Sequence, residues 1–464
     1  MDRTAEQIVQ FATALKFEDL SEDTIHQAKA RVIDSIGAAM AAHEAPPVRI
    51  ARSVAYPVNG AAGARLWGTL VLTAPDAAAF VNGVMVRYLD INDAYRTRDA
   101  AHPSDNLPGL MAVAETFGLN GRDLILGLAI SYEIQCRFTD FVPFNDNGWD
   151  QPVSGAPACA LATGRMLGLT REQLRNALAL AVVPNLCTYQ TRAGELSMRK
   201  GCAGPNGARQ GVFAALLARG GMTGPEYPFE GVFGVWKQTL GKAYDINLPT
   251  DMKGHAFALR QSNIKKHPVR DSCQLPIDTA LDLRRKIRAE EVASLKIETY
   301  KSAYVGAVQD RELWAPQTRE TADHSMPFTA IVALIDGEVT PGTFQRERFR
   351  GEDVLDLIRR TSIEINDDFA KQTPAVRNCR ITATAKDGKT AVAHRTLTLA
   401  EIERGFSDTE VEEKFHRLAR DTLSEAQRGK LLELAWRLET LSRIEPIIDL
   451  LAVNDGAAKN EARA

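Results

Sequence analysis

The sequence predicts a mainly α protein, with a large all-helical domain built from both chain ends and a smaller α+β domain between them. Apolar residues recur at helical spacing in the first half, alternate from about Leu259 onward, and return to helical spacing after Asp408. A chain of 464 residues also exceeds the size at which one hydrophobic core usually stops growing. We therefore expect two domains, residues 1–258 with 401–464 and residues 259–400.

Helical periodicity is clearest at residues 24–37. Its apolar side chains fall on one predicted helix face, at Ile25, Ala28, Val32, Ile33 and Ile36. Further predicted helices are separated by Gly, Pro and Asn and cover residues 74–89, 107–117, 121–136, 156–167, 171–181 and 207–218. Because small residues dominate many of them, we expect their axes to approach closely.

Alternation of apolar and polar residues predicts strands in the second domain. The predicted strands cover residues 294–300, 362–366, 379–385 and 392–399. The last two flank Asp387-Gly388, a pair typical of hairpin turns. Helical spacing resumes from 408 to about 451, so these helices should pack on the first domain, while the polar stretch 454–464 should be frayed.

Bulk composition indicates an ordinary globular protein. Hydrophobic residues make up 45% and charged residues 25%, and the formal net charge is -3, so neither nucleic acid nor a membrane is an expected partner. The N-terminus lacks the basic start and apolar core of a signal peptide, and no run of about 18 apolar residues occurs. We expect a cytoplasmic protein whose acidic small-molecule partner needs a local cationic pocket.

Cysteine spacing gives no sign of a metal centre. The six cysteines form no C-x-x-C pair, and H-E-x-x-H is absent. Neither the Walker motif nor the dinucleotide fingerprint occurs. We expect reduced thiols, no metal and no other cofactor.

The most unusual polar segment, residues 88–108, joins two predicted helices. Its chemistry-bearing side chains are Asp90, Asp93, His102, Ser104 and Asp105. The predicted helix begins near Leu107, so Ser104 or Asp105 can cap it, and the imidazole would face the anion-favouring space before its N-terminus. Histidine also exchanges protons near neutral pH. The plain alternative is a capped loop joining two helices.

Three other segments carry cations or histidines among small residues. Residues 190–207 contain Arg192 and Lys200 beside a glycine-rich bend, where partial burial would suit Lys200 to acid–base work. Residues 263–276 contain Lys265 and Arg270, which can bind carboxylates by charge-assisted hydrogen bonds. A solvated surface loop or basic patch remains open for both segments. A fourth segment, residues 318–328, contains His324 and is equally typical of an N-cap.

In their order along the chain, these segments resemble the MmgE/PrpD family. The motifs that carry the resemblance are Asp90-x-x-Asp93, His102-Pro103-Ser104-Asp105-Asn106, Ala114-Glu115, Tyr132-Glu133, Lys200-Gly201, Met222-Thr223-Gly224-Pro225, Ile264-Lys265 and Ala322-Asp323-His324-Ser325. Nearly the whole chain is covered. The resemblance implies an all-helical domain from both chain ends, an α+β lid domain, a homodimer, and a metal-independent active site in the cleft.

The resemblance also implies roles for individual residues. Asp90, His102 and Lys200 match the family's catalytic and substrate-contacting residues, and Lys265 matches a substrate-binding lysine in the lid. We expect His102 to transfer a proton next to a carboxylate while bound cations stabilise the developing charge. Further substrate-binding candidates are Arg270, Asp93, Ser104, Gln274, Arg192 and His324.

Three positions depart from the family pattern. Ala94 stands where a threonine often follows the second aspartate, Phe328 stands where a tyrosine is frequent, and Arg270 stands where the decarboxylase has histidine. Losing two hydroxyl donors and gaining a cation suggests a pocket rebuilt for another substrate.

The leading hypothesis is a cofactor-independent hydro-lyase, similar to 2-methylcitrate dehydratase, acting on a small polycarboxylate. Alternatives are an epimerase of a related polycarboxylate such as iminodisuccinate, or a decarboxylase of the cis-aconitate type. A non-catalytic helical scaffold that binds anions is the alternative outside enzymes.

Overall fold

The computed structural model describes residues 2–59 and 62–453, which divide into two compact units. Unit 1 comprises Met1–Tyr189, Gly201–Ile264 and Phe406–Ala464, and unit 2 comprises Gln190–Lys200 and Lys265–Gly405. The second domain was expected at 259–400, so the short segment Gln190–Lys200 is an addition that sequence patterning did not indicate. The expected fraying of 454–464 lies outside the described residues.

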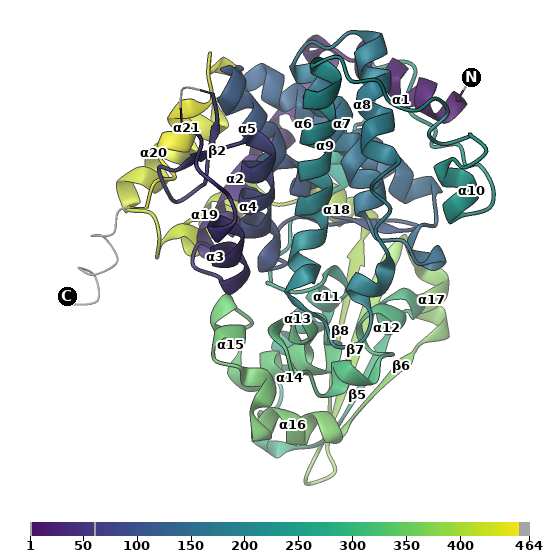
Figure 1. The fold of residues 1–464 in the computed structure, drawn as a ribbon. Helices are drawn as coiled ribbons and strands as arrows, with labels where there is room; N and C mark the ends of the chain where they lie inside the picture. The colour runs from purple at the N-terminus through teal and green to yellow at the C-terminus, as the bar shows by residue number, and fades with distance from the viewer. Residues whose placement is uncertain (1, 60–61, 454–464) are drawn as a thin grey trace. The chain divides into compact units, whose positions relative to one another are not determined.

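Unit 1 is built from helices (Figure 1). These are α1 Arg3–Ala14, α2 Glu22–Ala41, α3 Pro46–Ser53, α4 Pro75–Tyr88, α5 Leu107–Phe117, α6 Gly121–Phe141, α7 Pro152–Met166, α8 Arg171–Val182, α9 Ala203–Arg219, α10 Val235–Thr239, α19 Asp408–Ala419, α20 Glu425–Trp436 and α21 Glu445–Asp449. Two antiparallel ladders join β1 Ala64–Arg65 to β2 Leu72–Thr73 and β3 Tyr95–Arg96 to β4 Ala100–Ala101.

Both ends of the chain contribute to the core of unit 1. One buried cluster includes Ile8 and Val32 near the start of the chain and Phe415 and Ile447 near its end. The C-terminal helices α19 and α20 contact α2, as the yellow ribbon beside the purple one shows in Figure 1. This arrangement confirms the predicted mainly α fold class with a helical part formed by both ends.

Small residues let the helices of unit 1 pack closely, as their composition predicts. Helix α9 contacts α4, α7 and α8. At Gly211 in α9, a Cβ atom would lie 2.6 Å from Cβ of Cys159 and 2.7 Å from the backbone carbonyl of Ala156, so only glycine fits. The buried face of α2 is also as predicted, except that Ile25 is only half-buried.

Local capping defines helix ends that periodicity placed only roughly. Asn120 and Asp123 form reciprocal hydrogen bonds at the start of α6, with distances of 2.9 and 3.2 Å. The helix then continues to Phe141, five residues beyond the predicted end at Cys136, because its apolar face remains buried to Phe138.

Unit 2 contains a four-stranded sheet in the order β6-β5-β7-β8. Its strands are β5 Val292–Thr299, β6 Thr361–Ile365, β7 Val376–Ala385 and β8 Thr390–Thr398. The pair β5–β6 is parallel and the other pairs are antiparallel. Each strand overlaps a predicted one, and the β7–β8 turn contains Gly388 with φ +83°, which confirms the predicted hairpin.

Helices complete unit 2. They are α11 Asp271–Arg284, α12 Lys301–Ala307, α13 Arg319–Ala322, α14 Met326–Asp336, α15 Pro341–Gln345, α16 Glu352–Arg359, α17 Asp367–Gln372 and α18 Leu399–Arg404. Helix α11 contacts β7, β8 and α14. The core of unit 2 is a separate cluster that includes Ile297, Ile331 and Ile381.

Within the part of the chain that the structure describes, no helix has the length and apolarity needed to cross a membrane.

Candidate active site

The predicted site residues fall into two groups, one in each compact unit. In unit 1 they lie on the loop between α4 and α5. Helix α4 ends at Tyr88, and Asp90 then adopts a left-handed backbone with φ +53°, which reverses the chain at the helix end. The loop continues through the β3–β4 ladder to a 3-10 turn, η2 Pro103–Asn106, which leads directly into α5.

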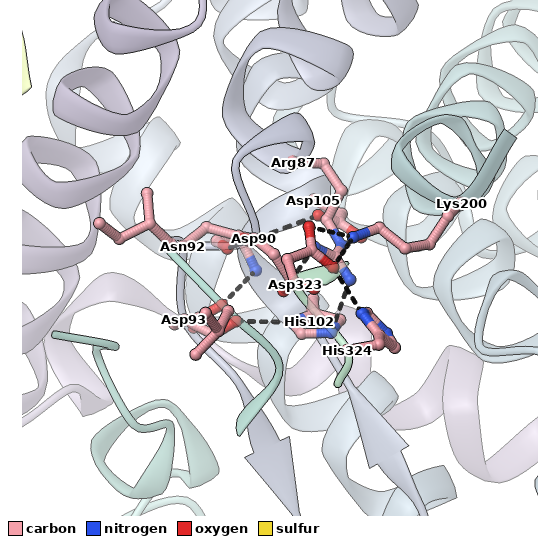
Figure 2. Close-up of polar contacts among 12 residues, drawn as sticks. Arg87, Asp90, Asn92, Asp93, His102, Asp105, Lys200, Asp323 and His324 are labelled. Atoms are coloured by element: carbon pink, nitrogen blue, oxygen red, sulfur yellow. Dashed lines mark hydrogen bonds and ion pairs between the residues drawn. The ribbon is translucent and has the colours of Figure 1, made fainter. Parts of the chain in front are cut away.

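His102 is held at three points. Its Nδ1 lies 2.7 Å from the backbone carbonyl oxygen of Asp93, and its Nε2 lies 2.9 Å from Nη2 of Arg87. Its backbone N–H donates to Oε1 of Gln151 at 2.7 Å. Figure 2 draws the imidazole among these loop residues. The ring is therefore fixed in orientation rather than free to rotate.

Arg87 is a buried cation at the end of α4. Its side chain is 1% exposed, and its Nη1 lies 2.7 Å from Oδ1 of Asp90. Its Nε lies 3.8 Å from Oδ2 of Asp105. Two carboxylates and an imidazole therefore share one guanidinium (Figure 2). Opposite charges at these distances offset part of the cost of burying each group.

The expected cap of α5 by Ser104 or Asp105 is wrong. Residues 103–106 form a 3-10 turn, and neither side chain accepts a hydrogen bond at the helix start. Instead Nδ2 of Asn92 donates to Oγ of Ser104 at 2.9 Å and to Oδ1 of Asp105 at 3.2 Å. The imidazole of His102 was expected to face the space before the N-terminus of α5, but its two ring nitrogens contact Arg87 on α4 and the Asp93 carbonyl on the loop.

Asp93 organises the loop through its backbone and side chain. Its Oδ1 accepts the backbone N–H of Ser104 at 3.2 Å, while its carbonyl accepts from His102. The carboxylate also raises the pKa of the Tyr132 phenol on α6, second to burial itself. Asp93 therefore faces the helical core, with its side chain fully buried.

The C-terminal part of the chain supports the same loop. Nζ of Lys414, on α19, donates to the backbone carbonyl of Ile91 at 2.8 Å and pairs with Asp34 on α2 at 2.5 Å. Burial raises the pKa of the Asp34 carboxyl above its usual value, although Lys414 opposes the shift. The residue next to Asp90 is thus fixed by a helix more than 300 positions later in the sequence.

The second group lies in unit 2 and centres on Asp323. Nζ of Lys200 lies 2.6 Å from both carboxylate oxygens of Asp323. Nη1 of Arg319 donates to the same carboxylate at 2.8 Å, and Nδ1 of His324 lies 2.6 Å from it. Burial alone would raise the pKa of Asp323, but Lys200, Arg319 and His324 hold it below its usual value. Lys200 is therefore buried rather than part of a solvated loop.

The remaining predicted residues of unit 2 differ in their surroundings. Lys265 is fully buried, and Arg192 donates to the backbone carbonyl of Lys200 at 3.4 Å. The backbone N–H of Arg270 donates to the Asp323 carbonyl at 2.9 Å, and the buried Nε of its guanidinium has no hydrogen-bond partner among the described residues. Arg270 is thus a cation available for an anionic group.

The side-chain amide of Gln274 makes four hydrogen bonds within its own segment of the chain. Its Oε1 accepts the backbone N–H groups of Lys266 and His267 at 3.1 and 3.0 Å. Its Nε2 donates to the carbonyls of His267 and Val269 at 2.9 and 3.1 Å. All four bonds brace the 266–269 loop, so the amide has little capacity left for a ligand.

Two of the departures from the family pattern also have structural explanations. Ala94 forms a backbone bridge with Asn263, with N–O distances of 2.9 and 2.7 Å. Phe328 is fully buried and packs edge-on against Phe344 and Phe349. Phe328 therefore belongs to the apolar core of unit 2 and gives no support to a rebuilt pocket.

Sequence reasoning did not select Arg87, Asp323 or Lys414. For Arg87 a signal existed, since it is the single charged residue in the run from Ala77 to Tyr88. Asp323 belongs to the Ala322-Asp323-His324-Ser325 motif of the resemblance, in which only His324 is a predicted substrate contact. The N-cap predicted for this segment exists as well, because Oγ of Ser325 accepts the N–H of Phe328 at 3.0 Å.

The cysteines are free thiols, as predicted. Burial raises the pKa of Cys159 and of Cys379 to about 12. Neither thiol forms a thiolate at neutral pH, so neither is a candidate nucleophile.

The molecule combines a helical unit formed by both chain ends, an α+β unit, and a loop whose Asp and His contact a buried Arg at the end of α4. Comparison with known protein families identifies the class of protein that has this organisation. The MmgE/PrpD N-terminal domain model matches residues 6–247 and the MmgE/PrpD C-terminal domain model matches residues 267–439. The chain belongs to the MmgE/PrpD family.

The relatives to which the chain is similar are named as two different enzymes, a decarboxylase and a dehydratase. The chain is 27% identical to cis-aconitate decarboxylase of Homo sapiens, over 95% of this chain and 93% of that protein. It is 29% identical to 2-methylcitrate dehydratase of Cupriavidus necator over 64% of each chain. It is 26% identical to 2-methylcitrate dehydratase of Escherichia coli strain K12, over 70% of this chain and 69% of that protein.

Proposed function

We propose that this protein is a lyase that acts on a small polycarboxylate, as a hydro-lyase of the 2-methylcitrate dehydratase type. The main support for this proposal is the geometry of the α4–α5 loop. His102 is fixed there between the Asp93 carbonyl and the Arg87 guanidinium, and Asp90 contacts the same guanidinium. A histidine of fixed orientation beside a carboxylate is suited to remove a proton from a carbon next to a substrate carboxylate.

In this proposal each group has one task. His102 accepts the carbon-bound proton at Nε2, because Nδ1 is committed to the Asp93 carbonyl. The electron pair of the broken C–H bond forms the carbon–carbon double bond, and the leaving hydroxide takes up the proton that His102 accepted, so that water is released. Asp90, held as a carboxylate by Arg87, orients these groups. Lys200 forms a buried ion pair with Asp323, so we assign it a cationic role rather than a basic one.

Substrate carboxylates would be bound by the cations of unit 2. Nε of Arg270 is buried without a hydrogen-bond partner among the described residues, and Lys265 matches the family's substrate-binding lysine. Arg192, His324, Asp93 and Ser104 remain proposed contacts, whereas we assign Gln274 to bracing the 266–269 loop. We further propose a cytoplasmic homodimer that needs no metal or other cofactor.

A cis-aconitate-type decarboxylase is the second candidate. The match to the human decarboxylase extends over 95% of the chain, against 64% to 70% for the two dehydratases compared above. The bond between carbon and one carboxylate would then break to release carbon dioxide, and the electron pair left on carbon would take up a proton from protonated His102, with the same cations stabilising the developing charge. Epimerisation of a related polycarboxylate requires only that the proton return to the opposite face.

One experiment separates these reactions. The protein is incubated in deuterated water with 2-methylcitrate, cis-aconitate and iminodisuccinate in turn, and products are followed by NMR. An unsaturated acid from 2-methylcitrate supports the dehydratase, carbon dioxide release from cis-aconitate supports the decarboxylase, and deuterium in stereochemically scrambled substrate supports the epimerase. A folded protein that converts none of them would overturn the proposal.

The role of His102 is tested separately. His102→Ala should lower kcat by about 100-fold or more, because general acid–base catalysis contributes 10²–10⁴-fold. Circular dichroism and substrate-analogue binding should stay close to those of the wild type. An unchanged kcat would remove His102 from the mechanism while leaving the substrate class open.

A further inference from the structure

Arg87 is a buried charge that the predicted chemistry does not explain. It lies on α4 among Val84, Met85 and Val86, all of which belong to the apolar core. Arginine is seldom buried this completely unless it is paired, and here its partners are Asp90, Asp105 and His102. Each of these lies on the loop that follows, so the charge is directed at the candidate site.

The contacts of His102 define its tautomer. The Asp93 carbonyl oxygen can only accept a hydrogen bond, so Nδ1 of His102 carries a proton. A guanidinium has only N–H donors and no acceptor, so Nε2 of His102 must accept from Arg87 and carries no proton. The imidazole is therefore neutral, with its lone pair directed at Arg87.

This arrangement couples the two acid–base groups of the loop. A proton cannot add to Nε2 while Arg87 occupies it, and an imidazolium at 2.9 Å from the guanidinium would place two cations together. Nη1 of Arg87 already contacts Asp90, so a shift of the guanidinium toward Asp90 would release Nε2. The backbone N–H of His102 is held by Gln151, so the imidazole keeps its place if the guanidinium shifts.

We propose that Arg87 is a positioning residue that keeps His102 as the neutral Nδ1–H tautomer, and that its guanidinium shifts further toward Asp90, which it already contacts, when His102 takes up a proton. The response of Arg87 to protonation of His102 rests on the proposed function. The tautomer of His102 is a property of the resting protein and holds whatever the substrate is.

Nitrogen NMR of the full chain with 15N-labelled histidine tests the resting state directly. The His102 signal is assigned from its loss in His102→Gln. We expect an unprotonated Nε2 and a protonated Nδ1 at neutral pH in the wild type. A protonated Nε2 would overturn the proposal, and this result does not depend on finding a substrate.

Arg87→Lys tests the positioning role. Lysine keeps the charge but cannot contact Asp90 and His102 with a planar fork, so Nε2 of His102 should change its shift. With a substrate in hand, kcat should fall by about 100-fold, the loss typical of a misplaced catalytic group. Wild-type nitrogen shifts and kcat in a folded Arg87→Lys would contradict the role.

Arg65→Lys is the matched control. Arg65 forms a comparable ion pair with Glu115 elsewhere in unit 1 and contacts no residue of the α4–α5 loop in the described contacts. It should leave the His102 signals unchanged and kcat within about two-fold. If both variants shift the His102 signals equally, the effect is general to unit 1 and the proposal fails.

Discussion

At the residue scale, burial decides what each charged side chain of the α4–α5 loop can do. Asp90 and Asp105 share Arg87, and Asp93 is held by the backbone of Ser104. A buried carboxylate without such partners would take up a proton instead of remaining charged. The same rule applies to Asp99 on the β3–β4 turn, where the partners are weaker and the pKa rises.

The pH dependence of stability follows from Asp99. Burial raises its pKa from 3.8 to about 6, although backbone N–H groups of Asn145 and Ala100 oppose the shift. The folded pKa exceeds the unfolded one, so the stability it contributes is full below about pH 4 and is lost as pH rises through about 6. The wild type should lose this free energy of unfolding between pH 4 and pH 8, whereas Asp99→Asn should not. The difference in unfolding free energy between the variant and the wild type should therefore increase by up to about 3 kcal/mol over this pH range.

Urea unfolding at the two pH values measures this gain. Asp387→Asn provides a control of opposite sign, because Lys389 lowers the pKa of Asp387 and that substitution should remove stability at high pH. An Asp99→Asn effect that is the same at pH 4 and pH 8 would contradict the assigned pKa.

At the element scale, close helix approach positions the loop. Helix α9 begins at Ala203, and a Cβ atom on the next residue, Gly204, would lie 1.8 Å from Oδ2 of Asp105. Asp105 also accepts hydrogen bonds from Asn92 and Gln151. A single missing methyl group therefore allows α9 to pack against the turn that precedes α5.

Gly204→Ala should disturb this turn. Asp105 would be displaced, at a cost of about 1–3 kcal/mol in stability and with a fall in turnover. Gly429→Ala in α20 is the matched control, since no atom lies within 4 Å of the added Cβ and a helical Gly→Ala change should stabilise by about 0.5–1 kcal/mol. Thermal unfolding and kcat measure both, and equal effects would contradict the close approach.

At the scale of the whole molecule, the end of the chain completes the first unit and supports its loop. Phe415 and Ile447 lie in the same core as Ile8, and Lys414 holds the Ile91 carbonyl beside Asp90. The C-terminal helices are thus part of the candidate site rather than an appendage to it.

Lys414→Met should show this dependence. It leaves Asp34 buried without its cation, which costs about 3–5 kcal/mol in unfolding free energy, and it releases the loop, which should lower kcat. Lys430→Met in α20 is the control, because its pair with Glu433 is about half exposed and should contribute at most about 1 kcal/mol. Similar losses from both variants would show that the loop does not depend on Lys414.

Much of the fold was predictable because it depends on local spacing. The predicted helix 107–117 has the same bounds as α5, and all four predicted strands overlap β5 to β8. The short helix α3, rich in Pro and Arg, was missed because it is too short to show periodicity. For the candidate site, the sequence predicted the α4–α5 loop, Lys200 and His324, and the roles of these residues remain proposals.

The sequence by itself determined the mainly α class, the change to alternating strands, the return to helices and the loop that carries Asp90 and His102, because these depend on residue spacing. Only the tertiary structure decided the partner of each buried charge. Lys200 meets Asp323 across 123 positions and Lys414 meets the Ile91 carbonyl across 323. Each of these pairs forms because a buried charge needs a partner nearby in the folded protein. The partners are far apart in the sequence, so residue spacing does not predict them.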